Sequence, residues 1–305
     1  MSRRSRRRKP GHLFHTAAED RQYARREVRT LDASPQLQSP AYRLAFDDED
    51  FLTREELRGV RLMLELNKPE LEQQAAGIAH TVVLFGSART PSPEQLVSHE
   101  AHLAQVERER AGSIEAMALR QRVKTLRQQN YYYNEARKLA RLVTERSRCE
   151  GCPDLTIVTG GGPGIMEAAN RGAAEAGGES IGLNIVLPHE QTPNAYITPR
   201  FCFQFHYFAI RKMHFLLRAR ALVAFPGGFG TLDELFETLT LVQTGKIEPI
   251  PVLIFGKEFW EHVINFNYLA EQGVISANDL DLFRYVETAE QAWELIRESL
   301  QDERE

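Results

Sequence analysis

Cysteine is scarce in this sequence: three occur among 305 residues, too few for a framework of disulfides. So few cysteines fit a reducing compartment, and we expect a cytoplasmic protein. No run of about 18 apolar residues occurs, so we expect no membrane-spanning helix. No apolar segment follows the basic start, so we expect no secretory signal either. The hydrophobic share of 42% excludes wholesale disorder.

The net charge of −4 hides a basic segment, because residues 3–9 hold five arginines and one lysine. Such a segment is typical either of contact with nucleic acid or an anionic surface, or of a solubilising, disordered end. It has no aromatic side chains to stack on bases, so we favour the second interpretation and do not expect nucleic acid as a partner. Residues 1–18 are therefore predicted to form a disordered basic tail.

Hydrophobic periodicity divides the rest of the chain in two. Between Phe51 and Leu71 the apolar residues recur on one face of a helix, with Pro69 as its expected end or kink. We predict a helical N-terminal extension over residues 19–76. Residues 77–305 are predicted to form an α/β domain, with a charged helical insertion at about 90–128.

Within this domain, short β-branched segments alternate with amphipathic ones. The expected strands are residues 80–85, 155–159, 180–186, 221–225 and 251–255. The expected helices are residues 131–143, 165–176, 207–220, 231–242, 259–271 and 288–300. This alternation predicts a Rossmann-like, doubly wound and mostly parallel sheet with helices on both faces.

Two glycine-rich turns, Gly160–Gly164 and Pro226–Gly230, each follow a strand and precede a helix, with Pro163 and Thr231 as expected helix-start residues. Glycine lets the backbone approach a phosphate, and the N–H groups of a helix start supply partial positive charge. A tight connection is the simpler interpretation of one such turn, but two predict one pocket for a nucleotide or sugar phosphate. The residues predicted to hold the phosphate are Gly160, Gly161, Gly162, Gly164, Pro226, Gly227, Gly228, Gly230 and Thr231.

Several common cofactor and metal motifs are absent. The dinucleotide pattern G-x-G-x-x-G fails at both turns, because Ile165 and Asp233 stand where its last glycine belongs. Lys246 lacks the upstream glycine of a P-loop, and no H-E-x-x-H occurs. Cys149 and Cys152 form an isolated C-x-x-C, which favours two incidental cysteines over a zinc or redox site. We therefore expect neither a metal nor a cofactor.

Three segments together resemble the LOG ("Lonely Guy") family, often labelled lysine decarboxylases. Pro226–Glu234 reads PGGFGTLDE and fits the family pattern P-G-G-x-G-T-x-x-E. Phe85–Arg89 (FGSAR) and Gly160–Glu167 (GGGPGIME) are similar to the other family motifs, and Arg211-Lys212 stands fifteen residues before Pro226. The resemblance runs from about residue 80 to 264 and is greatest to the longer bacterial members, which carry a helical N-terminal extension.

The resemblance implies a phosphoribohydrolase that cleaves the N-glycosidic bond of AMP or of cytokinin-type nucleotides, releasing the free base and ribose 5-phosphate. It places the catalytic pair at Arg211 and Glu234 and implies a homodimer or higher homo-oligomer. A carboxylate suits this reaction because it stabilises the oxocarbenium character that develops at C1′ and deprotonates water. The further residues expected at the substrate are Gly86, Ser87, Arg89, Met166, Glu167 and Lys212.

Alternatives to these assignments stay open. Thr231–Glu234 is also a capping box, in which Glu234 would only hold down the helix start. Asp233 or Glu237 would be able to share the catalytic role. A non-catalytic nucleotide or molybdenum-cofactor carrier of the same fold is the main alternative function. A decarboxylase would need pyridoxal phosphate on a lysine, and neither Lys212 nor Lys246 has such a context.

Overall fold

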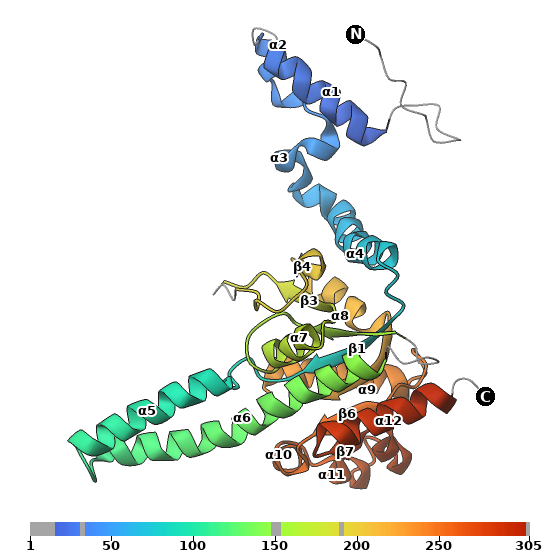
Figure 1. The fold of residues 1–305 in the computed structure, drawn as a ribbon. Coiled ribbons are helices and arrows are strands. Elements are labelled where there is room, and N and C mark those ends of the chain that lie inside the picture. The colour runs from blue at the N-terminus through green and yellow to red at the C-terminus, as the bar shows by residue number, and fades with distance from the viewer. Residues whose placement is uncertain (1–15, 31–33, 148–153, 189–191, 303–305) are drawn as a thin grey trace. The chain divides into compact units, whose positions relative to one another are not determined.

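The computed structural model describes residues 16–30, 34–147, 154–188 and 192–302 (Figure 1). The predicted basic tail up to residue 15 and the C-x-x-C at 149–152 lie outside them. By its contacts the chain divides into two units between Leu64 and Glu65. The first unit is helical, as predicted for the N-terminal extension. Its helices are α1 (Ala17–Thr30), α2 (Pro35–Gln38) and α3 (Glu49–Leu52), with 3-10 turns at Pro40–Tyr42, Ala45–Asp47 and Glu55–Leu57.

Helix α4 (Arg58–Ala75) runs through the buried Pro69, so of the end or kink expected at this proline, the end was wrong. Proline has no N–H, and the carbonyl of Glu65, four residues earlier, therefore loses its helical hydrogen bond. In the structure that carbonyl oxygen lies 3.3 Å from Nε2 of His214. A tertiary partner thus replaces the missing intrahelical one, which lets the helix continue.

The second unit is built on a seven-stranded sheet with the order β4-β3-β2-β1-β5-β6-β7, and all of its neighbouring strands are parallel. The strands are β1 (His80–Phe85), β2 (Leu155–Thr159), β3 (Ser180–Ile185), β4 (Cys202–Phe205), β5 (Ala219–Ala224), β6 (Val252–Phe255) and β7 (Arg284–Val286). The sequence predicted five of these and missed β4 and β7. Both missed strands are short edge strands, whose pattern is too brief to identify.

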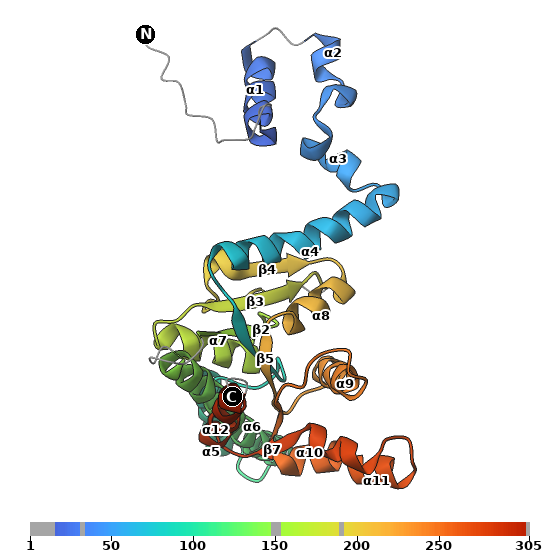
Figure 2. The ribbon, with the colours of Figure 1, turned by 90° about the vertical axis from the view of Figure 1, so that its right-hand side faces the viewer.

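Helices cover both faces of the sheet, which confirms the predicted doubly wound fold (Figure 2). The helices are α5 (Pro93–Glu109), α6 (Ile114–Arg146), α7 (Ile165–Glu175), α8 (Phe208–Leu216), α9 (Phe229–Gln243), α10 (Lys257–Val263), α11 (Phe266–Glu271) and α12 (Ala289–Asp302). The single helix predicted at 259–271 is therefore two. Alternate side chains of β1 enter the two cores: Val82 and Leu84 pack with α6, α7 and α12, whereas Val83 and Phe85 pack with α8 to α11.

The predicted insertion is a helical hairpin of α5 and the first half of α6, which extends away from the sheet (Figure 1). Ser92 starts α5 with a capping box. Ion pairs Arg120–Glu107 (2.7 Å) and Arg127–Glu100 (2.6 Å) join the two helices along one flank. The second half of α6 belongs to the core, where Tyr133 and Leu139 are fully buried.

Candidate active site

A cleft of about 580 Å³ opens at the carboxyl ends of β1 and β5. These two strands are neighbours, and the chain winds outward from them in opposite directions, which is where open α/β sheets bind ligands. The lining residues are Phe85, Gly86, Ser87, Ala88, Arg89, Gly160, Met166, Phe208, Arg211, Gly228, Phe229, Gly230, Thr231, Leu232, Asp233 and Glu234. Three separate predicted motifs therefore meet in one cavity.

The start of α9 forms one wall of this cleft. Its N-cap is Gly228, and the N–H groups of Thr231 and Leu232 both donate to the Gly228 carbonyl at 3.0 Å. Among the described residues, no acceptor is found for the backbone N–H of Phe229 or Gly230. Two free N–H groups at a helix start favour an anion here.

The predicted capping box at Thr231–Glu234 was wrong, because α9 starts at Phe229 and its N-cap is Gly228, three residues before Thr231. Glu234 consequently lies in the second turn of α9. Its side chain is 7% exposed. No hydrogen bond or ion pair in the described part of the chain holds its carboxylate. Burial raises the pKa of Glu234 to about 7, although the positive charges of Arg211 and Lys212 act to lower it.

Arg211 reaches the cleft from α8. Its Nε donates to the carbonyl of Leu183 at 2.7 Å, and the guanidinium lies over the ring of Phe215, with Cζ 5.0 Å from the ring centroid. A Cβ on Gly160 would lie 2.7 Å from Nη2 of Arg211, so glycine is needed at this close approach. Burial lowers the pKa of Arg211, while the Glu234 charge acts to raise it. The cation is thus fixed by backbone and ring contacts beside a buried acid.

Lys212 is not part of the cleft lining. Its Nζ lies 2.8 Å from Oδ2 of Asp233 and 3.1 Å from Oε2 of Glu237, the two carboxylates that flank Glu234 on α9. Asp233 lines the cleft but is exposed, and Glu237 does not line it. Lys212 therefore pairs with both rival acids, and among the described residues Glu234 is the carboxylate of the three without an ion pair.

Several backbone groups of the Gly160–Gly164 turn form hydrogen bonds with side chains of the protein. The N–H of Gly161 donates to Oγ1 of Thr159 at 3.0 Å, and Nδ2 of Asn194 donates to the carbonyls of Gly161 and Gly162. Gly164, rather than the expected Pro163, is the N-cap of α7. Of the residues predicted at this turn and the start of α7, Gly160 and Met166 line the cleft. The predicted residues that do not line it are Gly161, Gly162, Gly164 and Glu167, together with Pro226 and Gly227 from the other turn.

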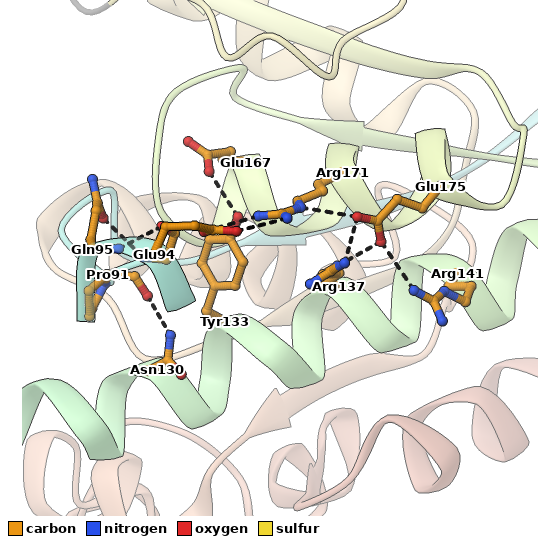
Figure 3. Close-up of polar contacts among 11 residues, drawn as sticks. Pro91, Glu94, Gln95, Asn130, Tyr133, Arg137, Arg141, Glu167, Arg171 and Glu175 are labelled. Atoms are coloured by element: carbon orange, nitrogen blue, oxygen red, sulfur yellow. Dashed lines mark hydrogen bonds and ion pairs between the residues drawn. The ribbon is translucent and has the colours of Figure 1, made fainter. Parts of the chain in front are cut away.

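Glu167 belongs to a polar cluster between α5, α6 and α7 (Figure 3). The Tyr133 hydroxyl donates to its Oε1 at 2.8 Å, and burial raises the pKa of that hydroxyl. Arg171 joins Glu94 of α5 at 2.9 Å and Glu175 at 3.1 Å. These contacts fasten the base of the hairpin to α7.

Sequence reasoning missed the apolar part of the cleft, formed by Phe85, Ala88, Phe208, Phe229 and Leu232. Phe229 is 90% exposed and Phe208 is 52% exposed. The only signal for Phe229 was its position inside the glycine motif. No group of three or more His, Cys, Asp or Glu side chains placed to hold a metal occurs among the described residues. None of the helices described is both long and apolar enough to cross a membrane.

Comparisons with known proteins agree with the motifs. A family model described as "Possible lysine decarboxylase" matches residues 166–296. The cytokinin riboside 5′-monophosphate phosphoribohydrolase LOG4 of Arabidopsis thaliana is 28% identical over 150 residues, which are 48% of this chain and 68% of LOG4. The rice enzyme LOG is 29% identical over 170 residues, 54% of this chain and 64% of its own. The predicted resemblance is confirmed.

Among solved structures, the molybdenum cofactor carrier protein of Chlamydomonas reinhardtii is similar, with 18% identity and a TM-score of 0.40. The match covers 73% of this chain and 98% of the carrier. At these values the likeness does not distinguish a carrier from a hydrolase.

Proposed function

We propose that this chain, which is similar to the LOG proteins, is a nucleoside 5′-monophosphate phosphoribohydrolase. Its substrate is AMP or a cytokinin-type nucleotide, and its products are the free base and ribose 5-phosphate. The observation that carries the proposal is the buried, unpaired Glu234 with a pKa of about 7, which shares one cleft with Arg211. An acid with such a pKa exchanges a proton readily near neutral pH.

The 5′-phosphate binds at the start of α9. Gly228, Gly230 and Thr231 line the cleft there, and the N–H groups of Phe229 and Gly230 are the donors. The positive end of the helix dipole favours the dianion. Because Glu234 lies one turn further along the same helix, holding the phosphate positions the ribose against its carboxylate.

Glu234 acts as the general base. Its carboxylate accepts a proton from water, whose oxygen bonds to C1′ as the C1′–N bond breaks. The departing base keeps the electron pair of that bond and takes up one proton from the solvent, while Glu234 returns the proton of the water to the solvent, so that no net proton is consumed. The negative charge of Glu234 also stabilises the oxocarbenium character at C1′. Arg211 supplies a fixed fork of donors to the ribose or phosphate oxygens.

The pH profile follows from the Glu234 pKa. The carboxylate must be ionised to act as a base, so we expect kcat/KM to rise with pH and to level off above about 7. Initial rates for AMP between pH 5.5 and 8.5 measure this. The Asp233→Asn variant is the control, and its kcat/KM should still fall at acidic pH as in wild type. A flat profile through this range would contradict the assignment of Glu234.

Phe229 is the expected platform for the nucleobase. Its ring is 90% exposed at the cleft, and stacking on a base contributes about 1–3 kcal/mol. We expect Phe229→Ala to raise KM for AMP about tenfold and to leave kcat within a small factor. Phe236→Ala is the matched control, since Phe236 lies on the same helix but not in the cleft. Equal KM values for the two variants would exclude base stacking at Phe229.

The decarboxylase suggested by the family description does not fit the cleft. Pyridoxal phosphate enzymes need a lysine that forms a Schiff base. The residues that line this cleft include no lysine. Lys212 is held by Asp233 and Glu237, and the exposed Lys246 also lies outside the lining.

A product assay tests the proposed function. Purified protein is incubated with AMP, GMP, CMP, UMP and an N6-prenylated AMP, and the products are separated by chromatography. We expect equal amounts of free base and ribose 5-phosphate from at least one adenine nucleotide. Adenosine, which has no phosphate for the α9 start, should react far more slowly. Tight binding of nucleotides that stay intact would instead identify a nucleotide-binding protein.

A further inference from the structure

Helix α8, which carries Arg211, has no cap from its own sequence. Its N-cap is Tyr207, and no side chain of its own segment accepts a hydrogen bond there. The N–H groups of His206 and Tyr207 instead donate to Oε1 and Oε2 of Glu65, at 2.8 and 3.1 Å. Glu65 belongs to α4 and is more than 140 residues away in sequence. A carboxylate at this position accepts hydrogen bonds from N–H groups that have no partner within the helix, and its negative charge interacts favourably with the helix dipole.

The backbone of Glu65 holds the other end of α8. Pro69 leaves the Glu65 carbonyl without a helical donor, and Nε2 of His214 lies 3.3 Å from it. His214 is buried, and its other ring nitrogen, Nδ1, has no partner in the described structure. Because a carbonyl oxygen can only accept, Nε2 of the His214 ring carries a proton and donates it to the Glu65 carbonyl. One residue thus bonds the N-cap residue of α8, the residue before it and the last turn of the helix.

Arg211 lies between these two attachments. Arg211 lines the cleft, and its guanidinium donates a hydrogen bond to the carbonyl of Leu183 in β3. The position of the guanidinium therefore depends on how α8 packs against the sheet. A shift of about 1 Å in a catalytic group is enough to reduce a rate by two orders of magnitude.

We propose that Glu65 is a positioning residue, through which α4 holds α8 and so sets the place of Arg211 in the cleft. This inference rests on the proposed function for its kinetic consequence, but the attachment itself is independent of that function. It assigns a role in the reaction to the helix that precedes the α/β sheet.

The test compares Glu65→Ala with Glu70→Ala in the full chain. Glu70 lies on the same helix and pairs with both terminal nitrogens of Arg218, beyond the end of α8. Both variants lose a tertiary contact of the α4 side chains, but only the first loses the side-chain attachment at the start of α8. The backbone contact of residue 65 with His214 is kept in both. Kinetics with AMP, affinity for ribose 5-phosphate and hydrogen exchange of the α8 amides are measured for each.

We expect Glu65→Ala to lower kcat between tenfold and a hundredfold and to speed exchange in α8. Its affinity for ribose 5-phosphate should fall less than kcat does, because the phosphate donors at the start of α9 do not depend on α8. Glu65→Gln, which keeps one acceptor, should lie between wild type and Glu65→Ala. Glu70→Ala should keep wild-type kcat and exchange in α8.

An unchanged kcat in a folded Glu65→Ala variant would overturn the inference, as would an equal loss in Glu70→Ala. Failure of the proposed function is recognised separately, since the wild type would then release no base. In that case the exchange of α8 still decides the attachment: equal rates in Glu65→Ala and wild type refute it, and faster exchange in Glu65→Ala alone supports it.

Discussion

Glu234→Gln is expected to reduce kcat for AMP by about 10²–10⁴-fold, the range that general acid–base catalysis contributes. The amide matches the carboxyl group in shape but neither accepts a proton from water nor carries the charge that stabilises the ribose cation. The proposed 5′-phosphate site at the start of α9 is untouched, so KM should change little. Steady-state kinetics with AMP measure both constants.

The same variant has a second, independent readout in its stability. Glu234 has a pKa of about 7 in the folded chain against 4.5 in the unfolded chain, so its ionisation opposes folding. This cost is absent below pH 4.5 and complete above pH 7. At about 1.4 kcal/mol per pKa unit, the free energy of unfolding of Glu234→Gln should rise relative to wild type by about 2.5 kcal/mol between pH 5 and pH 8. Denaturant unfolding at both pH values measures it.

Asp233→Asn is the matched control for both readouts, because Asp233 is an exposed neighbour paired with Lys212. It should retain most of kcat and show little of this change in stability. Full activity of Glu234→Gln would refute the catalytic assignment. A large loss of kcat in Asp233→Asn alone would transfer the role to Asp233.

Arg211→Lys is expected to lower kcat/KM for AMP by about 10²-fold, although the positive charge is kept. Lysine has neither the Nε–H that donates to Leu183 nor the planar group that lies over Phe215. The ammonium would therefore move within the cleft, and the fork of donors would be lost. Steady-state kinetics with AMP compare this variant with wild type.

The control for Arg211→Lys is the reverse exchange at the neighbouring residue, Lys212→Arg. Lys212 lies outside the cleft lining, and arginine can still pair with Asp233 and Glu237. We expect this variant to keep activity within about threefold of wild type. If Arg211→Lys were as active as Lys212→Arg, the fixed geometry of Arg211 would have no part in the reaction.

Local patterns in the sequence were sufficient for much of the fold. The five strands predicted from β-branched runs exist, because residues buried on both faces of a parallel sheet must be apolar almost continuously. The two glycine turns that follow strands were likewise predicted from neighbouring residues alone. Pro69 shows the limit: a rule about helix interiors failed because His214, far away in sequence, bonds the carbonyl that proline leaves free.

For the candidate site, the sequence by itself determined which residue types stand at the cleft: glycines and Thr231 at a helix start, and Arg211 and Glu234 near it. Only the tertiary structure decided their states. Burial raises the pKa of Glu234, and Lys212 forms ion pairs with Asp233 and Glu237. Burial and charge pairing depend on which segments the fold brings together, and spacing along the chain does not contain that information.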